Sequence, residues 1–320
     1  MCSAFASGFK GALLLLLTSL NGGGQELKVT LLGTGSPIPM LERFGPSILV
    51  EAGPEKLLID CGRGASLRLW QLHIPLGAVT AVFLTHLHSD HVVGIPDLWL
   101  TGWLPPPFGH RTHAFQIWGP IGTNEMMANL QKAFATDLRF GMADGIPEQG
   151  IAIAAQEIAQ GLVYERDGIK ITAFEVDHAT ARPAFGYRID YRGRSVVLSG
   201  DTRPSENLVR FPKHVDLLIH EVAWARPELL QKSQAARIII GLHTTPEQAG
   251  TIFARVKPRL AVYSHIVLIT TDPAFTAPND ADVLKLTRET YVGPLEMGQD
   301  LMTIRIGTNI DVRRSGSVMR

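Results

Sequence analysis

The sequence lacks three features that would narrow its class at once: paired cysteines, an excess of one charge and a long apolar run. Its 2 cysteines are Cys2 and Cys61, and the cleavage considered below would remove the first. No disulfide could then form within the chain, so cysteine content favours no compartment. The 30 basic and 30 acidic residues cancel, so no overall field recruits nucleic acid or an anionic membrane. With 320 residues, 45% of them hydrophobic, the chain can still bury a large globular core.

The N-terminus has the pattern of a secretory signal. Lys10 precedes the apolar stretch Ala12–Leu20, and small and polar residues follow as far as Gln25. This stretch is too short to span a bilayer, so we expect a signal peptide over residues 1–24 and one domain over 25–320. The predicted location is secreted or periplasmic, without stable membrane insertion after cleavage. An uncleaved anchor and a mis-assigned start codon, which would leave the protein cytoplasmic, are the alternatives.

Short β-like runs, separated by turn signals and helical patterns, predict an α/β fold. They form one series before residue 160 and a second after it, like two half-domains around one site. Helices between runs and a hairpin at Tyr191–Gly193 favour a sandwich of mixed sheets over a regular parallel sheet. The runs are LKVTLLG, SILVEAG, KLLIDCG, AVTAVFLTH and AFQIWGP, then GIKITAFEVDH, AFGYRIDYRGRSVVLSGD, VDLLIHEV and RLAVYSH, with helical patterns at Gly64–Leu72, Ile95–Leu104, Gly122–Phe134 and Pro246–Arg255.

The densest cluster of chemically active side chains is HLHSDH, which follows an apolar run. His86 and His88, one residue apart, can face one point from an extended loop, while Asp90 and His91 turn toward a second point. One ion could not accept all four groups and keep an open coordination position, so two adjacent metal positions are predicted.

Each later β-like run supplies a further candidate ligand where it ends. One run stops at His178, one at Asp201 and one at His265. A lone histidine after a strand is commonly a core or loop residue, but several such strand ends together favour a metal site. The resulting set suffices for two three-ligand sites that share one carboxylate.

HLHSDH, with GTGSP, LLIDCG, SGDT, HE and the last SH, resembles the signature of the metallo-β-lactamase-fold hydrolases. The resemblance covers nearly all of the chain after Glu26. It implies an αββα sandwich of two mixed β-sheets flanked by helices, with two Zn²⁺ ions at one edge; Mn²⁺ or Fe²⁺ are alternatives. It also implies hydrolysis by a metal-bridging hydroxide. The resemblance assigns His86, His88 and His178 to the first metal, Asp90, His91 and His265 to the second, and Asp201 to the bridge between them.

Within that superfamily, Asp201 and the later motifs indicate a branch. The β-lactamases generally lack a bridging aspartate, so cleavage of a sulfate or phosphate ester is expected before cleavage of a lactam. GTGSPIP, GDT, HEV and HTTPEQAG resemble ribonuclease Z, in which a Glu–His pair protonates the leaving oxygen; here the pair is Glu221 and His243. A purely structural role for this pair is the alternative. Asp90, Glu221 and His243 are thus the predicted catalytic residues.

One departure from ribonuclease Z bears on the substrate. That family usually carries a long tRNA-binding arm between the third ligand histidine and the bridging aspartate, whereas His178 and Asp201 leave room only for a hairpin. With the balanced charge and the predicted signal peptide, this favours an exported, arylsulfatase-like enzyme acting on a small anionic ester. The alternatives are a ribonuclease Z-type phosphodiesterase or endoribonuclease, for which nucleic acid would be the substrate, and a β-lactamase. A homodimer is possible because relatives often dimerise, and a non-catalytic metal-binding protein is the remaining alternative.

Overall fold

The strands of the first series form one mixed sheet. The computed structural model describes residues 27–270 and 276–314, so the predicted signal peptide lies outside the described residues. This eight-stranded sheet has the order β15-β14-β1-β2-β3-β4-β5-β6, with antiparallel pairing as far as β3 and parallel pairing beyond it. Its strands are β1 (Leu27–Gly33), β2 (Ser47–Ala52), β3 (Glu55–Ile59), β4 (Ala81–Phe83), β5 (Phe115–Gly119), β6 (Ile153–Glu157), β14 (Thr303–Ile306) and β15 (Ile310–Arg313).

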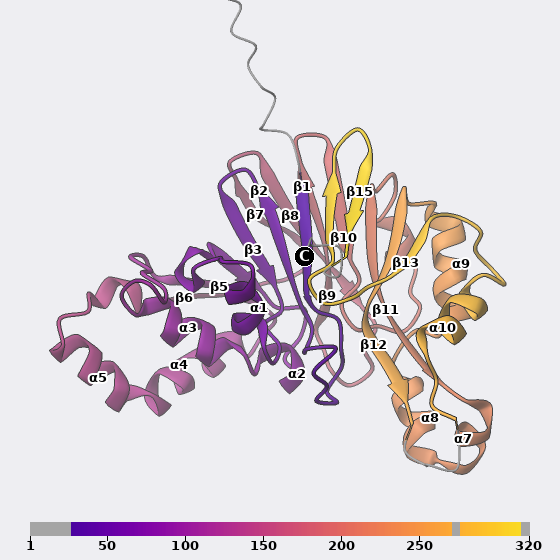
Figure 1. The fold of residues 1–320 in the computed structure, drawn as a ribbon, viewed down its shortest axis with the longest axis horizontal. Coiled ribbons are helices and arrows are strands. Elements are labelled where there is room, and N and C mark those ends of the chain that lie inside the picture. Colours follow the sequence, from indigo (N-terminus) through magenta and orange to yellow (C-terminus); the bar gives the residue numbers. More distant parts are fainter. Residues whose placement is uncertain (1–26, 271–275, 315–320) are drawn as a thin grey trace, which may run out of the picture.

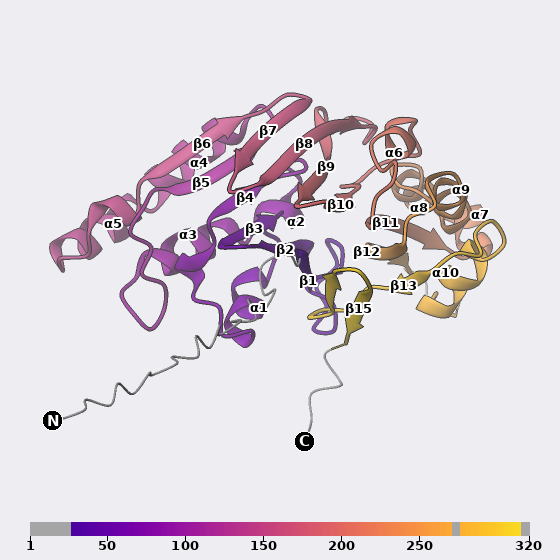
Figure 2. The ribbon, with the colours of Figure 1, turned by 90° about the horizontal axis from the view of Figure 1, so that it is seen from above.

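The second series forms a seven-stranded sheet with the order β13-β12-β11-β10-β9-β8-β7. The predicted hairpin at residues 191–193 joins β9 to β10, and it occupies the space between His178 and Asp201 where an arm would lie. Figure 2 shows the two sheets as adjacent layers. The strands are β7 (Gly161–Arg166), β8 (Ile169–Val176), β9 (Ala184–Tyr191), β10 (Arg194–Leu198), β11 (Leu217–Ala225), β12 (Leu260–Ile269) and β13 (Leu295–Met297).

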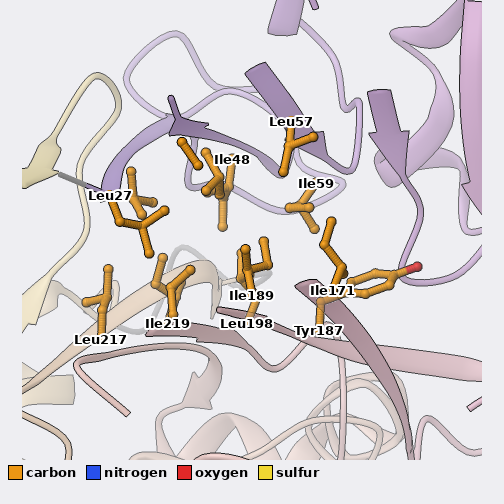
Figure 3. Packing of buried hydrophobic residues seen from close by; sticks show 14 of the residues in the cluster. Leu27, Ile48, Leu57, Ile59, Ile171, Tyr187, Ile189, Leu198, Leu217 and Ile219 are labelled. Carbon is orange, nitrogen blue, oxygen red and sulfur yellow. The ribbon is translucent and has the colours of Figure 1, made fainter. Parts of the chain in front are cut away.

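The central core lies between the sheets. Alternate side chains of one strand point toward the other sheet, as Leu27, Val29 and Leu31 of β1 do, while Leu32 joins the cluster on the outer face. Figure 3 shows the inner faces meeting, with Ile48 on one side and Ile219 on the other. Both faces of each sheet are therefore buried, which explains why the strands read as continuous apolar runs.

Helices cover the outer faces and complete the αββα arrangement. Helices α1, α3 and α4 cover the first sheet and α6, α9 and α10 cover the second, on opposite sides of the molecule in Figure 2. Among the described residues no helix is long and apolar enough to cross a membrane. The helices, most of which are labelled in Figure 1, are α1 (Ala65–Gln71), α2 (Ser89–Val92), α3 (Ile95–Trp103), α4 (Thr123–Ala133), α5 (Ala135–Ala143), α6 (Asn207–Arg210), α7 (Pro227–Lys232), α8 (Gln234–Ile240), α9 (Pro246–Val256) and α10 (Asp280–Thr287).

The C-terminal part of the chain joins the two series of strands. After β13, the chain returns to the first sheet, where β14 pairs antiparallel with β1. The first sheet is thus completed by both ends of the described chain. This return fixes the loop after β1 beside the last strands of the second series.

Candidate metal centre and its surroundings

The candidate ligands lie where strands of both sheets end. The loop after β4 carries His86 and His88 and leads into α2, whose first turn holds Asp90 and His91. His178 follows β8 in the same way. Because these loops meet at one edge of the sandwich, residues far apart in the sequence face a common space.

Two local backbone features aim the remaining candidates. Gly200, just before Asp201, has a φ of +61°, and a Cβ there would lie 2.5 Å from the carbonyl oxygen of Phe185, so only glycine fits. The sequence suggested that His265 ends its strand, but His265 lies within β12. A register shift opposite Glu221 forms a bulge there, and His265 has a φ of +47°. Such a bulge re-aims a side chain without ending the strand.

The first group of candidate ligands converges through ring nitrogens. Nδ1 of His88 lies 2.9 Å from Nε2 of His86 and 3.3 Å from Nε2 of His178. Both of these Nε2 atoms lie 3.9 Å from Oδ2 of Asp201. His86 and His178 are almost fully buried, whereas His88 lies at the surface.

The second group lies against the same carboxylate. Oδ2 of Asp90 is 3.6 Å from Nε2 of His91 and 3.3 Å from Nε2 of His265. Oδ2 of Asp201 is 3.4 Å from the first of these nitrogens and 3.2 Å from the second. Asp201 therefore stands between the two groups, in the position expected of a bridging ligand.

The chemistry of this cluster fits two cations. Buried Nε2 of His91 and Oδ1 of Asp201 have no hydrogen-bond partner among the described residues. Burial lowers the pKa of His86 well below its ordinary value. Burial alone would raise the pKa of Asp201, but the rings of His265 and His91 hold it well below its usual range. Neutral imidazoles and an ionised carboxylate are the forms that bind metal. Four groups of three residues could each hold an ion, because the three donor atoms of each group lie within 4.8 Å of one another.

The surroundings of His91 also favour bound cations. Although its burial opposes the charged ring, the carboxylates of Asp201 and Asp60 raise the pKa of His91 well above its ordinary value. Two buried carboxylates beside one ring thus leave a surplus of negative charge that cations would neutralise.

The outer nitrogens of the candidate ligands are held by the protein. Nδ1 of His91 lies 2.8 Å from Oδ2 of Asp60, and the same carboxylate accepts the backbone N–H and the hydroxyl of Thr85. Nδ1 of His86 lies 3.1 Å from that hydroxyl, and Nδ1 of His178 lies 3.1 Å from the carbonyl oxygen of Leu242. Such contacts fix ring orientation and strengthen metal binding. Asp60 was missed from the sequence, although KLLID stops at an aspartate just as other runs stop at candidate ligands.

Glu221 and His243 lie together beside the cluster, as the sequence predicted. Nδ1 of His243 is 3.3 Å from Oε2 of Glu221, whose Oε1 accepts the backbone N–H of Thr244 at 2.7 Å. Burial alone would lower the pKa of His243, but the Glu221 carboxylate raises this pKa to about 9. The ring centroids of His243 and His265 lie 5.6 Å apart, so His243 adjoins the cluster of candidate ligands.

The loop after β1 is held by a residue near the C-terminus and in turn supports the candidate metal centre. The backbone N–H and hydroxyl of Thr34 both donate to Oδ1 of Asp300 at 2.9 Å, and the other carboxylate oxygen pairs with Arg68 at 2.8 Å. The carbonyl oxygen of Thr34 accepts the N–H of Ile266 at 2.9 Å. Because Ile266 follows His265, this network holds the bulge that presents the His265 ring.

Comparison with known proteins gives a consistent family. A model of the beta-lactamase superfamily domain matches residues 48–266. The chain is 33% identical over 294 residues to "Ribonuclease Z" of Mycolicibacterium gilvum, covering 91% of this chain and 100% of that protein. It is 34% identical to "Ribonuclease Z" of Mycobacterium avium, covering 88% and 98% respectively.

Two solved structures share the fold. The metallo-beta-lactamase fold protein YhfI from Bacillus subtilis matches with a TM-score of 0.68 at 17% identity, covering 88% of this chain and 99% of that one. The short form of human tRNase Z matches with a TM-score of 0.63 at 22% identity, covering 87% and 98%.

Proposed function

Because this chain belongs to the beta-lactamase superfamily, in its ribonuclease Z-like branch, and is a metal-dependent hydrolase acting on ester bonds, we propose that it cleaves phosphodiester bonds in RNA with two zinc ions. The observation that carries the proposal is the position of Asp201 between two groups of candidate ligands, with His243 beside it. A shared carboxylate between two metals is the arrangement used for in-line displacement at phosphate.

The relatives favour RNA over the sulfate ester that the sequence analysis placed first. The main argument against RNA is that the sequence leaves no room for a long tRNA-binding arm. The ribonuclease Z of M. gilvum aligns over its whole length across 294 residues of sequence, which leaves no room for a long additional arm in that relative either. The short β9–β10 hairpin is therefore compatible with ribonuclease Z, and the arylsulfatase reading moves to second place.

The chain's own residues would hold the metals in two neighbouring positions. His86, His88 and His178 would hold one ion, and Asp90, His91 and His265 the other, with Asp201 between them. When bound, zinc supplies Lewis-acid polarisation of the phosphate and activation of the attacking water. Asp60 and Thr85 would keep the rings oriented, since both contact the outer nitrogens of candidate ligands.

His243 would donate the proton that the leaving oxygen requires. Its Nδ1 lies 3.3 Å from Oε2 of Glu221, which would leave Nε2 for the leaving oxygen. A carboxylate that stabilises the charged ring keeps the proton available, and general-acid assistance of this kind contributes roughly 10²–10⁴-fold. This step matters most for a sugar alkoxide, which is a poor leaving group.

The test is to purify the chain with its metal content quantified and compare an RNA carrying a 3′ extension, bis(p-nitrophenyl) phosphate and an aryl sulfate. RNA cleavage at one internal bond supports the proposal. Turnover of the aryl sulfate without RNA cleavage would restore the sulfatase reading. Glu221→Gln should lower RNA cleavage, and combining it with His243→Ala should add little, because the two residues act as one unit.

A further inference from the structure

A groove opens directly beside the first group of candidate metal ligands. Its volume is about 240 Å³, and its lining includes His86, His88 and the loop residues 180–183. A ligand in this groove would therefore lie next to the candidate metal ligands.

One side of the groove carries a cation with unused hydrogen-bonding capacity. The Arg182 side chain is 69% exposed, and its ion-pair partner Asp177 lies 3.5 Å away. Asp177 is already committed, because Nη2 of Arg203 lies 2.7 Å from each of its carboxylate oxygens. Arg182 thus keeps most of its five N–H donors for another anion. No carboxylate is found among the described residues that line the groove.

Part of the groove lining is apolar. Ile121, which follows β5 and is 69% exposed, lines the groove together with Leu87 and Pro120. A groove lined by both an exposed isoleucine and an arginine is a poor surface for a small hydrophilic anion alone. It suits a ligand that has both a flat apolar face and a phosphate.

We propose that this groove binds a nucleotide that flanks the scissile phosphate, with Arg182 holding its phosphate and Ile121 and Leu87 packing against its base. This inference rests on the proposed function, since it deepens the choice of RNA as substrate. A sulfate ester of a small alcohol would reach the metals without filling the groove. Arg182 and Ile121 are thus specificity determinants for nucleotide substrates.

The first measurement is the ratio of kcat/KM for RNA to kcat/KM for bis(p-nitrophenyl) phosphate. Arg182→Ala should lower this ratio by about tenfold, and Arg182→Lys by less, because lysine keeps the charge but loses the planar fork. The slope of log affinity for RNA against log salt concentration should also become less steep, by the amount expected for about one phosphate contact. Arg313→Ala is the matched control: Arg313 is 64% exposed and paired with a nearby aspartate, but lies on β15, outside the groove. The control should leave the ratio unchanged.

A second measurement separates failure of this inference from failure of the proposed function. Adenosine 5′-monophosphate should inhibit hydrolysis of the small diester, and Arg182→Ala should raise its inhibition constant by about tenfold. Ile121→Ser should raise it as well, without a change in salt dependence. If the wild-type enzyme cleaves RNA but Arg182→Ala and Arg313→Ala behave alike in both measurements, the groove assignment is wrong. If the wild-type enzyme cleaves only the small diester, RNA as substrate is wrong, and the inhibition constants still decide whether the groove binds a nucleotide.

Discussion

Oδ2 of Asp60 lies 2.8 Å from Nδ1 of His91, although 31 residues separate them in the sequence. This contact connects the end of β3 with the metal-facing turn after β4. It directs Nε2 of His91 toward Asp201 and Asp90. Asp60 thus orients a candidate metal ligand without being one itself.

Asp60→Asn should weaken metal binding by about 10–100-fold, since an amide orients the ring less firmly and removes a buried charge. Titrating metal into the apo-protein in a calorimeter measures this affinity. Asp216→Asn is the control, because Asp216 is also buried and accepts a backbone N–H but lies before β11, away from the metal centre. Equal metal affinity for Asp60→Asn and the wild type would show that Asp60 has no such role.

The sequence predicted much of this centre because several candidates followed apolar runs. His178 and Asp201 were found in this way, and the structure places both beside HLHSDH. It could not reveal that Asp60 contacts His91, because that pairing depends on two loops that meet only after folding. It also could not reveal the bulge at His265, since a bulge depends on the register of the partner strand.

The fold shows the same division between local and long-range information. Long apolar runs such as that of β8 were predicted correctly, whereas β6, β7, β13, β14 and β15 were missed; the last three have only three or four residues, which carry little periodicity. Their places are fixed by pairing with β12 and β1, which lie far away in the sequence.

Metal removal should lower thermal stability as well as activity. Ions that bind only the folded state stabilise it, by about 2.7 kcal/mol at a hundredfold excess over Kd. Adding Zn²⁺ to chelator-treated protein should therefore raise Tm, and the rise should be smaller for Asp201→Ala. A Tm that does not respond to Zn²⁺, Mn²⁺ or Fe²⁺ would contradict the metal centre.

His243→Ala should reduce activity according to the leaving group. RNA cleavage should fall by about 10²–10⁴-fold, because a sugar oxygen needs a proton as it departs. Hydrolysis of bis(p-nitrophenyl) phosphate should fall much less, since nitrophenolate is a stable anion. Steady-state kinetics with both substrates checks this; equal losses would assign His243 to the integrity of the loop instead.

Asp300→Ala should destabilise the fold by about 3 kcal/mol. The change leaves the largely buried Arg68 without its counter-charge and removes the acceptor for Thr34. Urea unfolding measures the loss. The control is Asp311→Ala at an exposed ion pair with Arg313, where a change within about 0.5 kcal/mol is expected. Similar values for the two variants would refute the bracing role of Asp300.

We propose that Asp201 bridges two metals in an enzyme that cleaves RNA. This is tested most directly by comparing the metal content and the cleavage of a 3′-extended RNA between the wild-type protein and Asp201→Ala. We expect two metals per chain and site-specific cleavage for the wild type, with loss of a metal and a fall in rate of at least about 10³-fold for the variant. A variant as active as the wild type, or a wild type that turns over an aryl sulfate or a lactam but not RNA, would contradict it.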